Sequence, residues 1–368
     1  MGNDLRDKIA FSLIPGIGNA NSKKLIAHFG NIKNVFGASK NELLKVPGIG
    51  PQLANEILDK SVFDYADEEV GFVEKNKIDV YFLLDKNYPE RLKHCEDSPV
   101  ILYFKGTCDL NRQKVLSIVG TRNATQYGKD RCNELVKGLS SNGHNPLIVS
   151  GLAYGVDVCA HKAAIKNGLS TIGVLGHGLQ MMYPASHRQA ARDIINSGGG
   201  LLTEFSSKSK LDPSNFVKRN RIIAGMADAT IVVESGQKGG SLITADIANS
   251  YNRDVFAFPG RVNDKQSIGC NRLIKTNRAA LIENVSDLEY ILGWEKESDK
   301  KIIQKQLFVE LNPDEQIVLD VLKSAEALSV DVICLKSNFP MSKVSSILLK
   351  LEFSGMVKSM PGKIYGLG

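Results

Sequence analysis

Residues 147–168 read LIVSGLAYGVDVCAHKAAIKNG, and this stretch decides the fold. Its first residues, 147–150, form an apolar run of the kind found in strands buried on both faces. A glycine-rich turn follows, and residues 157–168 then carry apolar side chains at helical spacing. A buried strand that passes through a glycine turn into a helix is the repeating unit of a parallel α/β sheet.

The same order of strand, loop and helix recurs over about residues 78–293. The alternation predicts an extended Rossmann-like fold, in which a doubly wound, mostly parallel sheet carries helices on both faces. Residues 78–110 precede it and are expected to form an extension packed on the sheet. Apolar runs predict strands at 115–119, 147–150, 171–175, 201–205, 230–234 and 254–258, and amphipathic runs predict helices at 128–142, 157–168, 186–197, 241–252 and 270–279.

Loops rich in glycine and small polar residues follow four of the predicted strands. In an open parallel sheet, ligands bind beyond the carboxyl ends of the strands, and glycine lets backbone amides approach an anion closely. The four loops therefore predict an anion-lined crevice at one edge. They contain Gly120, Thr121 and Arg122; Ser150 and Gly151; Gly176, His177 and Gly178; and Lys238, Gly240 and Ser241, followed by Thr244 in the helix that they open.

Basic residues are predicted to join this edge. Residues 216–221 read FVKRNR and place three cations in four positions, directly before an apolar run interpreted as a strand. Arg122 and Arg221 are expected to clamp phosphates through their forked guanidinium groups. Phe216 either stacks on a base or belongs to the core. The whole chain has a net charge of only +6, so the local concentration of cations is the stronger signal.

The first 65 residues contain an internal repeat. IPGIG at 14–18 and VPGIG at 46–50 lie 32 residues apart, and each precedes a helical pattern. Proline and glycine favour a tight hairpin, and free amides at the next helix start can hold a phosphate. The repeat resembles a tandem helix-hairpin-helix domain that binds DNA; the alternative is that the hairpins only pack domain against domain. The glycines concerned are Gly16, Gly18, Gly48 and Gly50.

Residues 311–368 read as a small appended unit. Helical patterns at 313–323, 329–337 and 341–353 precede two short extended segments around a Pro-Gly turn. This order predicts a winged-helix domain. Its third helix carries Lys343 and Lys350 among many apolar residues. The unit therefore either reads DNA or is a protein-contact module that keeps the winged-helix shape.

Other classes of function lose support from the sequence. The six cysteines are scattered without a C-x-x-C pair, so no zinc site or disulfide scaffold is expected. The chain shows no Ser-His-Asp set, no complete G-x-G-x-x-G fingerprint and no Walker lysine, so no metal, cofactor or catalytic residue is expected. No apolar run suits a membrane span and the start lacks a signal-peptide core, so we expect no membrane association and a cytoplasmic location.

Taken in order, the motifs VGTR (119–122), SGLAYGVD (150–157), FVKRNR (216–221), GSLITA (240–245) and PG (259–260) resemble the DprA/Smf family of DNA-processing proteins. The resemblance implies a protein that binds and protects single-stranded DNA without sequence specificity and is not an enzyme. It also implies loading of RecA recombinase during natural transformation, and a homodimer formed through the Rossmann-like domain. The expected DNA-binding residues are Gly120, Thr121, Arg122, Ser150, Gly151, Phe216, Lys218, Arg219, Asn220, Arg221, Lys238, Gly240, Ser241 and Thr244.

A nucleotide-processing enzyme of the same superfamily is the competing interpretation. The "lonely guy" phosphoribohydrolases also open a helix with a glycine loop, but their motif G-G-x-G-T-x-x-E ends in a glutamate. When Gly240 and Ser241 are set on the Gly-Thr of that motif, Thr244 stands at the glutamate position.

The predicted organisation has three domains. Residues 1–65 form a helical, SAM-like helix-hairpin-helix domain with possible duplex contacts, and residues 66–295 form the Rossmann-like domain. A linker at 296–310 leads to the winged helix at 311–368.

Overall fold

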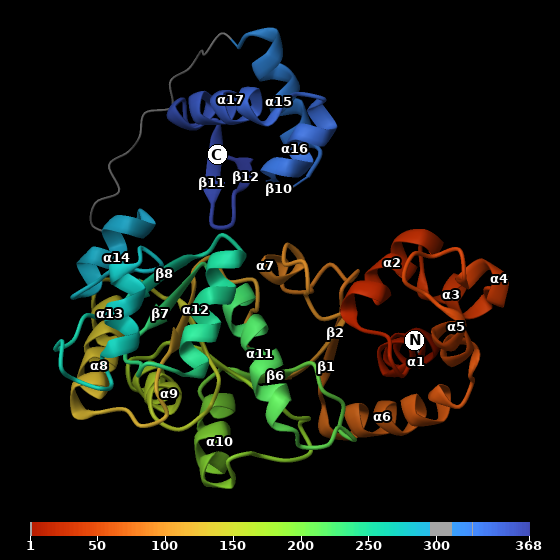
Figure 1. The fold of residues 1–368 in the computed structure, drawn as a ribbon, viewed down its shortest axis with the longest axis horizontal. Helices are drawn as coiled ribbons and strands as arrows, with labels where there is room; N and C mark the ends of the chain where they lie inside the picture. Colours follow the sequence, from red (N-terminus) through yellow and green to blue (C-terminus); the bar gives the residue numbers. More distant parts are fainter. Residues whose placement is uncertain (1, 295–310, 326) are drawn as a thin grey trace.

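The computed structural model describes residues 2–294, 311–325 and 327–368, which form a helical N-terminal unit, a central α/β unit and a small C-terminal unit (Figure 1). The predicted linker, residues 296–310, lies outside the described residues. Within the described ranges, every helix is too short or too polar to cross a membrane.

The N-terminal unit contains the repeat as two hairpins. Gly16 and Gly48 have φ angles of +73° and +94°, which favour glycine. The hairpins pack reciprocally: a Cβ on Gly16 would lie 3.0 Å from Leu53, and one on Gly48 would lie 2.9 Å from Asn21. The helices are α1 (Gly2–Leu13), α2 (Asn19–Phe29), α3 (Ile32–Gly37), α4 (Lys40–Leu43), α5 (Pro51–Leu58) and α6 (Val62–Asn76).

The central unit is built on a sheet that has nine strands within the described residues, in the order β1-β2-β6-β5-β4-β3-β7-β8-β9. Pairing is parallel from β6 through to β9, so the predicted doubly wound, mostly parallel sheet is confirmed. The strands are β1 (Asp79–Phe82), β2 (Ile101–Gly106), β3 (Val115–Val119), β4 (Leu147–Ser150), β5 (Thr171–Val174), β6 (Gly200–Thr203), β7 (Ala229–Val232), β8 (Asp254–Ala257) and β9 (Ala280–Leu281).

The segment at 78–110 extends the sheet, as predicted. It does so by adding two strands, because β2 pairs antiparallel with β6 and β1 pairs antiparallel with β2, while the short helix α7 (Glu90–Lys93) packs on the sheet. Residues 101–104 of β2 are all buried. The apolar run therefore covers the backbone groups of β6 that would otherwise form an open edge.

Helices cover both faces of the sheet. Leu116 and Ile118 of β3 face one helix layer, whereas Val115 and Val119 face the other, as the twofold strand period requires. The first layer contains α8 (Gln126–Ser141), α9 (Val156–Lys166), α10 (Arg188–Asn196) and α14 (Val285–Leu292), and the second contains α7 (Glu90–Lys93), α11 (Pro213–Met226), α12 (Gly240–Ser250) and α13 (Ile268–Lys275).

The prediction was wrong about the FVKRNR segment, which lies inside helix α11 and not ahead of a strand. Asp212 caps this helix, since its carboxylate accepts a hydrogen bond from Ser214 N at 2.7 Å, and Pro213 occupies the first turn. Residues 222–226 are all buried. A helix that is buried on most sides shows the same continuous apolar run as a buried strand, and this similarity caused the error.

The C-terminal unit has the predicted winged-helix order. Its hairpin points toward the central unit (Figure 1), and the guanidinium of Arg253 donates a hydrogen bond to Pro361 O in the hairpin turn at 2.6 Å. The elements are α15 (Pro313–Lys323), β10 (Leu328–Ser329), α16 (Val330–Ser337), α17 (Met341–Phe353), β11 (Val357–Met360) and β12 (Ile364–Leu367).

Candidate nucleic-acid interface

The predicted edge contains the point where the order of the strands along the sheet reverses. The chain runs from β3 outward through β4, β5 and β6, and then returns to place β7 on the other side of β3. In doubly wound sheets, ligands bind beyond the carboxyl ends of the strands at such a point. Here the loops after β3 and β7 meet, because Thr121 N donates a hydrogen bond to Glu234 O at 2.7 Å.

The loop after β3 lies directly against the start of α9. Val156 N donates a hydrogen bond to Thr121 O at 3.2 Å. Gly155 has a φ of +77°, and a Cβ there would lie 2.2 Å from Thr121 O. Only glycine therefore allows this close approach. The contact leaves the Arg122 side chain exposed, with no hydrogen bond or ion pair to another described residue.

The loop after β7 opens α12. Gly239 is the N-cap and has no side chain to bond the first amides of the helix. Lys238 and Gly240 are exposed, whereas Ser241 and Thr244 are buried. Ser241 Oγ donates to Ser235 Oγ at 3.0 Å, and Thr244 Oγ1 donates to Gly240 O at 3.0 Å. The two hydroxyl groups thus hold the loop in place. Thr244, which stands where the phosphoribohydrolase motif has its glutamate, carries a buried hydroxyl instead of a carboxylate.

Phe216 and Lys218, in the first turns of α11, reach the same edge. A Cβ on Gly176 would lie 2.8 Å from Phe216 Cδ1, so the ring covers the loop after β5. The ring also packs on Tyr183, with centroids 5.5 Å apart. Phe216 is half-buried and Lys218 is exposed. The two roles considered for Phe216, core and base contact, are therefore compatible.

Arg219 is placed inside the protein, although it was predicted to contact DNA. It is 4% exposed, and its Nη1 donates hydrogen bonds to Gly151 O at 2.6 Å and to Val174 O. Burial lowers the pKa of Arg219 to about 10, which the charge of Asp157 partly opposes. Burial likewise raises the pKa of Asp157. From inside the protein, Arg219 thus connects the loop after β4 to the carboxyl end of β5.

Arg221, predicted to clamp a phosphate, is bound to a carboxylate. Its Nη2 lies 2.5 Å from Glu204 Oε2, its Nε lies 4.0 Å from Asp97 Oδ2, and its side chain is only 11% exposed. Positions two apart on a helix point in different directions, so FVKRNR cannot present all its cations on one face. Asn220 is also buried, and its Nδ2 donates to Gly240 O at 3.4 Å.

Ser150 is part of the sheet and not of its surface. Its side chain is fully buried, and its Oγ donates a hydrogen bond to Ile118 O at 2.6 Å. Gly151, which follows, is buried beside Arg219; a Cβ there would lie 2.4 Å from Arg219 Nη1. These two residues therefore shape the second loop from within.

The first hairpin packs domain against domain. Lys23 Nζ donates to Cys95 O at 2.9 Å and to Glu96 O at 2.6 Å, and burial lowers the pKa of this lysine. Val100 N donates to Asn19 Oδ1 at 3.3 Å. Gly18 and Gly50 remain exposed, with nothing within 4 Å of a built Cβ. Helix α2 therefore has the packing role, whereas Gly18 and Gly50 remain accessible to solvent.

Both lysines of helix α17 in the winged helix are paired. On α17, Lys343 Nζ lies 2.8 Å from Asp314 Oδ2, and Lys350 Nζ lies 2.5 Å from Glu315 Oε1. The same helix exposes 54% of Leu349 and 84% of Phe353. Its surface is therefore more apolar and less cationic than its sequence suggests.

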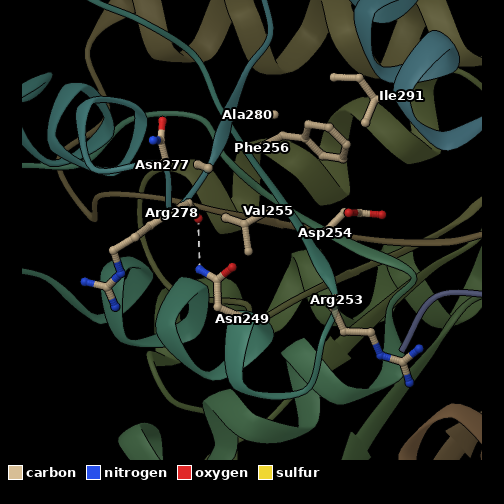
Figure 2. Close-up of a pocket in the computed structure, with 10 residues that line it drawn as sticks. Asn249, Arg253, Asp254, Val255, Phe256, Asn277, Arg278, Ala280 and Ile291 are labelled. Atoms are coloured by element: carbon tan, nitrogen blue, oxygen red, sulfur yellow. Dashed lines mark hydrogen bonds between the residues drawn. The ribbon is translucent and has the colours of Figure 1, made fainter. Parts of the chain in front are cut away.

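A pocket of about 330 Å³ lies at the opposite end of the sheet, where β8 begins (Figure 2). Three of its polar side chains already bind the protein. Asn249 Nδ2 donates to Arg278 O at 2.9 Å, Arg278 pairs with Asp246, and Arg253 donates to Pro361 O. This pocket is separate from the glycine loops and takes no part in the predicted crevice.

Sequence reasoning missed the acidic partners and one aromatic side chain. Glu204 and Asp97 bind Arg221 from segments distant in sequence, so no local pattern could reveal them. Tyr154 lies inside the second glycine loop and is half-exposed. An aromatic residue within a loop of small residues was a signal available in the sequence.

Comparison with known proteins identifies the class as DNA-processing proteins built on a Rossmann-like sheet. The chain matches the family model of DNA recombination-mediator protein A over residues 79–292, the DprA winged-helix domain over 306–363 and a helix-hairpin-helix motif over 8–63. It therefore belongs to the DNA recombination-mediator protein A family, DprA/Smf, as the sequence motifs predicted.

Individual relatives agree over most of their length. Protein Smf of Synechocystis is 31% identical, with 97% of each chain covered. The crystal structure of DNA processing protein A from Streptococcus pneumoniae has a TM-score of 0.66 at 30% identity and covers 77% of this chain and 97% of its own. The structure of the Helicobacter pylori protein, reported for its single-stranded DNA binding mode, has a TM-score of 0.52 at 28% identity and covers 59% and 95%.

Proposed function

We propose that this protein binds single-stranded DNA without sequence preference along the carboxyl edge of its central sheet. The observation that carries the proposal is a row of exposed cations, Arg122, Lys218 and Lys238, beside glycine loops. None of the three has an ion-pair partner in the described part of the chain. Cations and backbone amides that bind phosphates carry no sequence information, so such an edge suits any single strand.

The remaining predicted residues divide into two roles. Small residues at the surface let the sugar-phosphate chain approach the backbone, and buried residues hold the loops in position. The first role falls to Thr121 and Gly240. The second falls to Gly120, where a Cβ would lie 2.4 Å from Val156, and to Ser150, Gly151, Arg219, Asn220, Arg221, Ser241 and Thr244.

The wider role follows the family resemblance. We infer that the bound strand is protected and passed to RecA recombinase during natural transformation, in the cytoplasm. A homodimer formed through the Rossmann-like domain would set two such edges side by side. The open glycine turns at Gly18 and Gly50 are candidates for weaker duplex contacts. We propose an activity of binding, with no turnover of substrate. The single-stranded DNA binding mode reported for the Helicobacter pylori relative supports the binding.

The experiment is a titration of a fluorescent oligo-dT in increasing salt, for the full chain and for Arg122→Ala. Affinity is expected to fall steeply with salt, because phosphate contacts release counterions. Arg122→Ala should lose about 1–3 kcal/mol of binding free energy, as for a charge-assisted phosphate contact, and flatten the salt dependence by roughly one charge. Lys343→Ala, whose lysine is paired on α17, is the matched control and should bind like the parent.

Two outcomes would contradict the proposal. One is that the purified protein ignores oligonucleotides even in dilute buffer. The other is that it releases base from a nucleoside monophosphate, which would favour the hydrolase class instead. Unchanged affinity of Arg122→Ala over the whole salt range would remove that residue from the site.

A further inference from the structure

Tyr154 is an exposed aromatic residue held in a fixed position. It lies between β4 and α9, and half of its surface (50%) is exposed. Its hydroxyl forms a hydrogen bond with Ser186 Oγ at 2.8 Å. Its ring meets His187 edge to face, with centroids 4.7 Å apart. A surface tyrosine normally keeps rotamer freedom, but here both the hydroxyl and the edge of the ring are restrained.

The support beneath Tyr154 is buried and hydrogen-bonded. His187 is 7% exposed, and its Nδ1 lies 3.0 Å from Leu152 O, in the same loop as Tyr154. The loop and its support therefore brace each other. A ring that is ordered before binding loses less entropy when it contacts a ligand.

Tyr154 also adjoins the phosphate-binding candidate. The next residue, Gly155, lies so close to the loop after β3 that a Cβ there would be 2.2 Å from Thr121 O and 2.6 Å from Arg122 O. A free guanidinium and a fixed, exposed ring therefore project from two backbone segments that touch. Phosphate and base are the two parts of a nucleotide that these groups bind.

We propose that Tyr154 is a stacking platform for a base of the single strand, next to a phosphate held by Arg122. This inference rests on the proposed function. The ring tolerates any sequence, because every base has a π face. Segment 183–187 links this platform to the rings of Tyr183 and Phe216, because it carries Tyr183 at one end and Ser186 and His187 at the other.

The test compares two ligands, oligo-dT and an abasic oligomer of equal length, in a salt titration of the full chain. Tyr154→Ala is expected to bind oligo-dT about five- to tenfold more weakly, at the lower end of base-stacking effects. It should bind the abasic strand unchanged and keep the salt slope, since no phosphate contact is lost. Tyr154→Phe keeps the ring and should stay within about twofold of the parent.

Controls separate stacking from structural damage. Tyr65→Ala removes a tyrosine of similar exposure (56%) on α6 and should leave both affinities unchanged. Tyr154→Leu keeps apolar bulk in case the alanine variant fails to fold, and it should lose oligo-dT affinity while keeping abasic affinity.

The inference is overturned if Tyr154→Ala and Tyr154→Leu bind oligo-dT like the parent. It is equally overturned if they lose both ligands alike, because Tyr154 would then only position the Arg122 loop. Failure of the proposed function looks different: the unmodified protein itself would bind neither strand.

Discussion

The carboxyl edge of the sheet and helix α17 of the winged helix both carry lysine or arginine where DNA binding was predicted, yet they differ in available charge. At the sheet edge, Arg122 is exposed and has no ion-pair partner among the described residues. On α17, Lys343 and Lys350 each bind a carboxylate of α15. The difference is whether a neighbouring helix supplies an acid, which the local sequence does not reveal.

The two regions also differ in what supports their cations. Beneath the sheet edge lies a buried polar layer, in which Arg219 bonds two loop carbonyls beside Asp157 and His161 bonds Thr171. Under α17 the contacts are apolar, and Leu349 and Phe353 remain exposed on its surface. A braced, charged edge suits a polyanion, whereas the surface of α17 fits the protein-contact interpretation better.

The largest expected effect tests the buried layer. Arg219→Ala should lower the free energy of unfolding by about 3–5 kcal/mol, because it leaves Asp157 without its opposite charge and two carbonyls without a donor. Urea denaturation of the full chain measures the loss. Lys343→Ala is the control from the other region. It breaks a pair whose two side chains are 41% and 45% exposed and should change stability by less than about 1 kcal/mol. Equal losses would abolish the distinction between the two regions.

The second prediction uses the pH dependence of the same layer. Burial lowers the pKa of His161 to about 3, with further lowering by Arg219 and His187. The unfolded chain takes up this proton near pH 6.5, whereas the folded protein resists it, so stability is complete above pH 6.5 and falls below it. The loss should reach about 2 kcal/mol at pH 5.

The control for this prediction is His161→Gln. The raised pKa of Asp157 acts in the opposite direction, since a carboxyl with a raised pKa contributes stability as pH falls. The difference between the parent and His161→Gln isolates the histidine. Parallel pH curves for the two proteins would mean that His161 does not remain neutral in the fold.

The fold was largely predictable because its signals are local. Strands at 115–119 and 147–150 and helices at 313–323 and 341–353 were predicted with the bounds that the structure has. Each is an apolar run bounded by turn residues or a helix with a clear start signal. Helix α11 was missed because burial on most sides erased its periodicity. Strand β2 was missed because its pairing partner β6 is distant in sequence, and β1 because it joins the sheet only through β2.

The candidate site was predictable only as a set of loops. The glycine positions predicted which loops lie at the carboxyl edge, because backbone segments that approach closely require glycine, as at Gly155. The side chains divided unexpectedly: Arg122 faces solvent, but Arg219 and Arg221 face the interior. That division depends on helix phase and on Glu204, a partner supplied by tertiary structure.

A smaller effect is expected when the second region is removed. Deleting residues 311–368 should change single-strand affinity by less than about threefold, because both lysines of α17 are paired and paired lysines contribute little to counterion release. The same oligo-dT titration measures it. A tenfold loss would instead make the winged helix part of the main site. Arg253 loses its bond to Pro361 in this deletion, so Arg253→Lys in the full chain separates the loss of that contact from the loss of the domain.

The smallest effect concerns the charge of Lys350, which Glu315 neutralises. Glu315 binds Lys350 through Oε1 and accepts Asn312 N through Oε2 at 2.9 Å, within a capping box. Glu315→Gln keeps a residue that suits the capping box but removes the charge, which frees Lys350. Duplex and single-strand affinities at low salt should then rise by no more than about twofold, as expected for one added surface cation. The same titration of the double variant Lys350→Ala/Glu315→Gln is the control. A rise near tenfold that this control lacks would show that pairing with α15 prevents α17 from binding DNA.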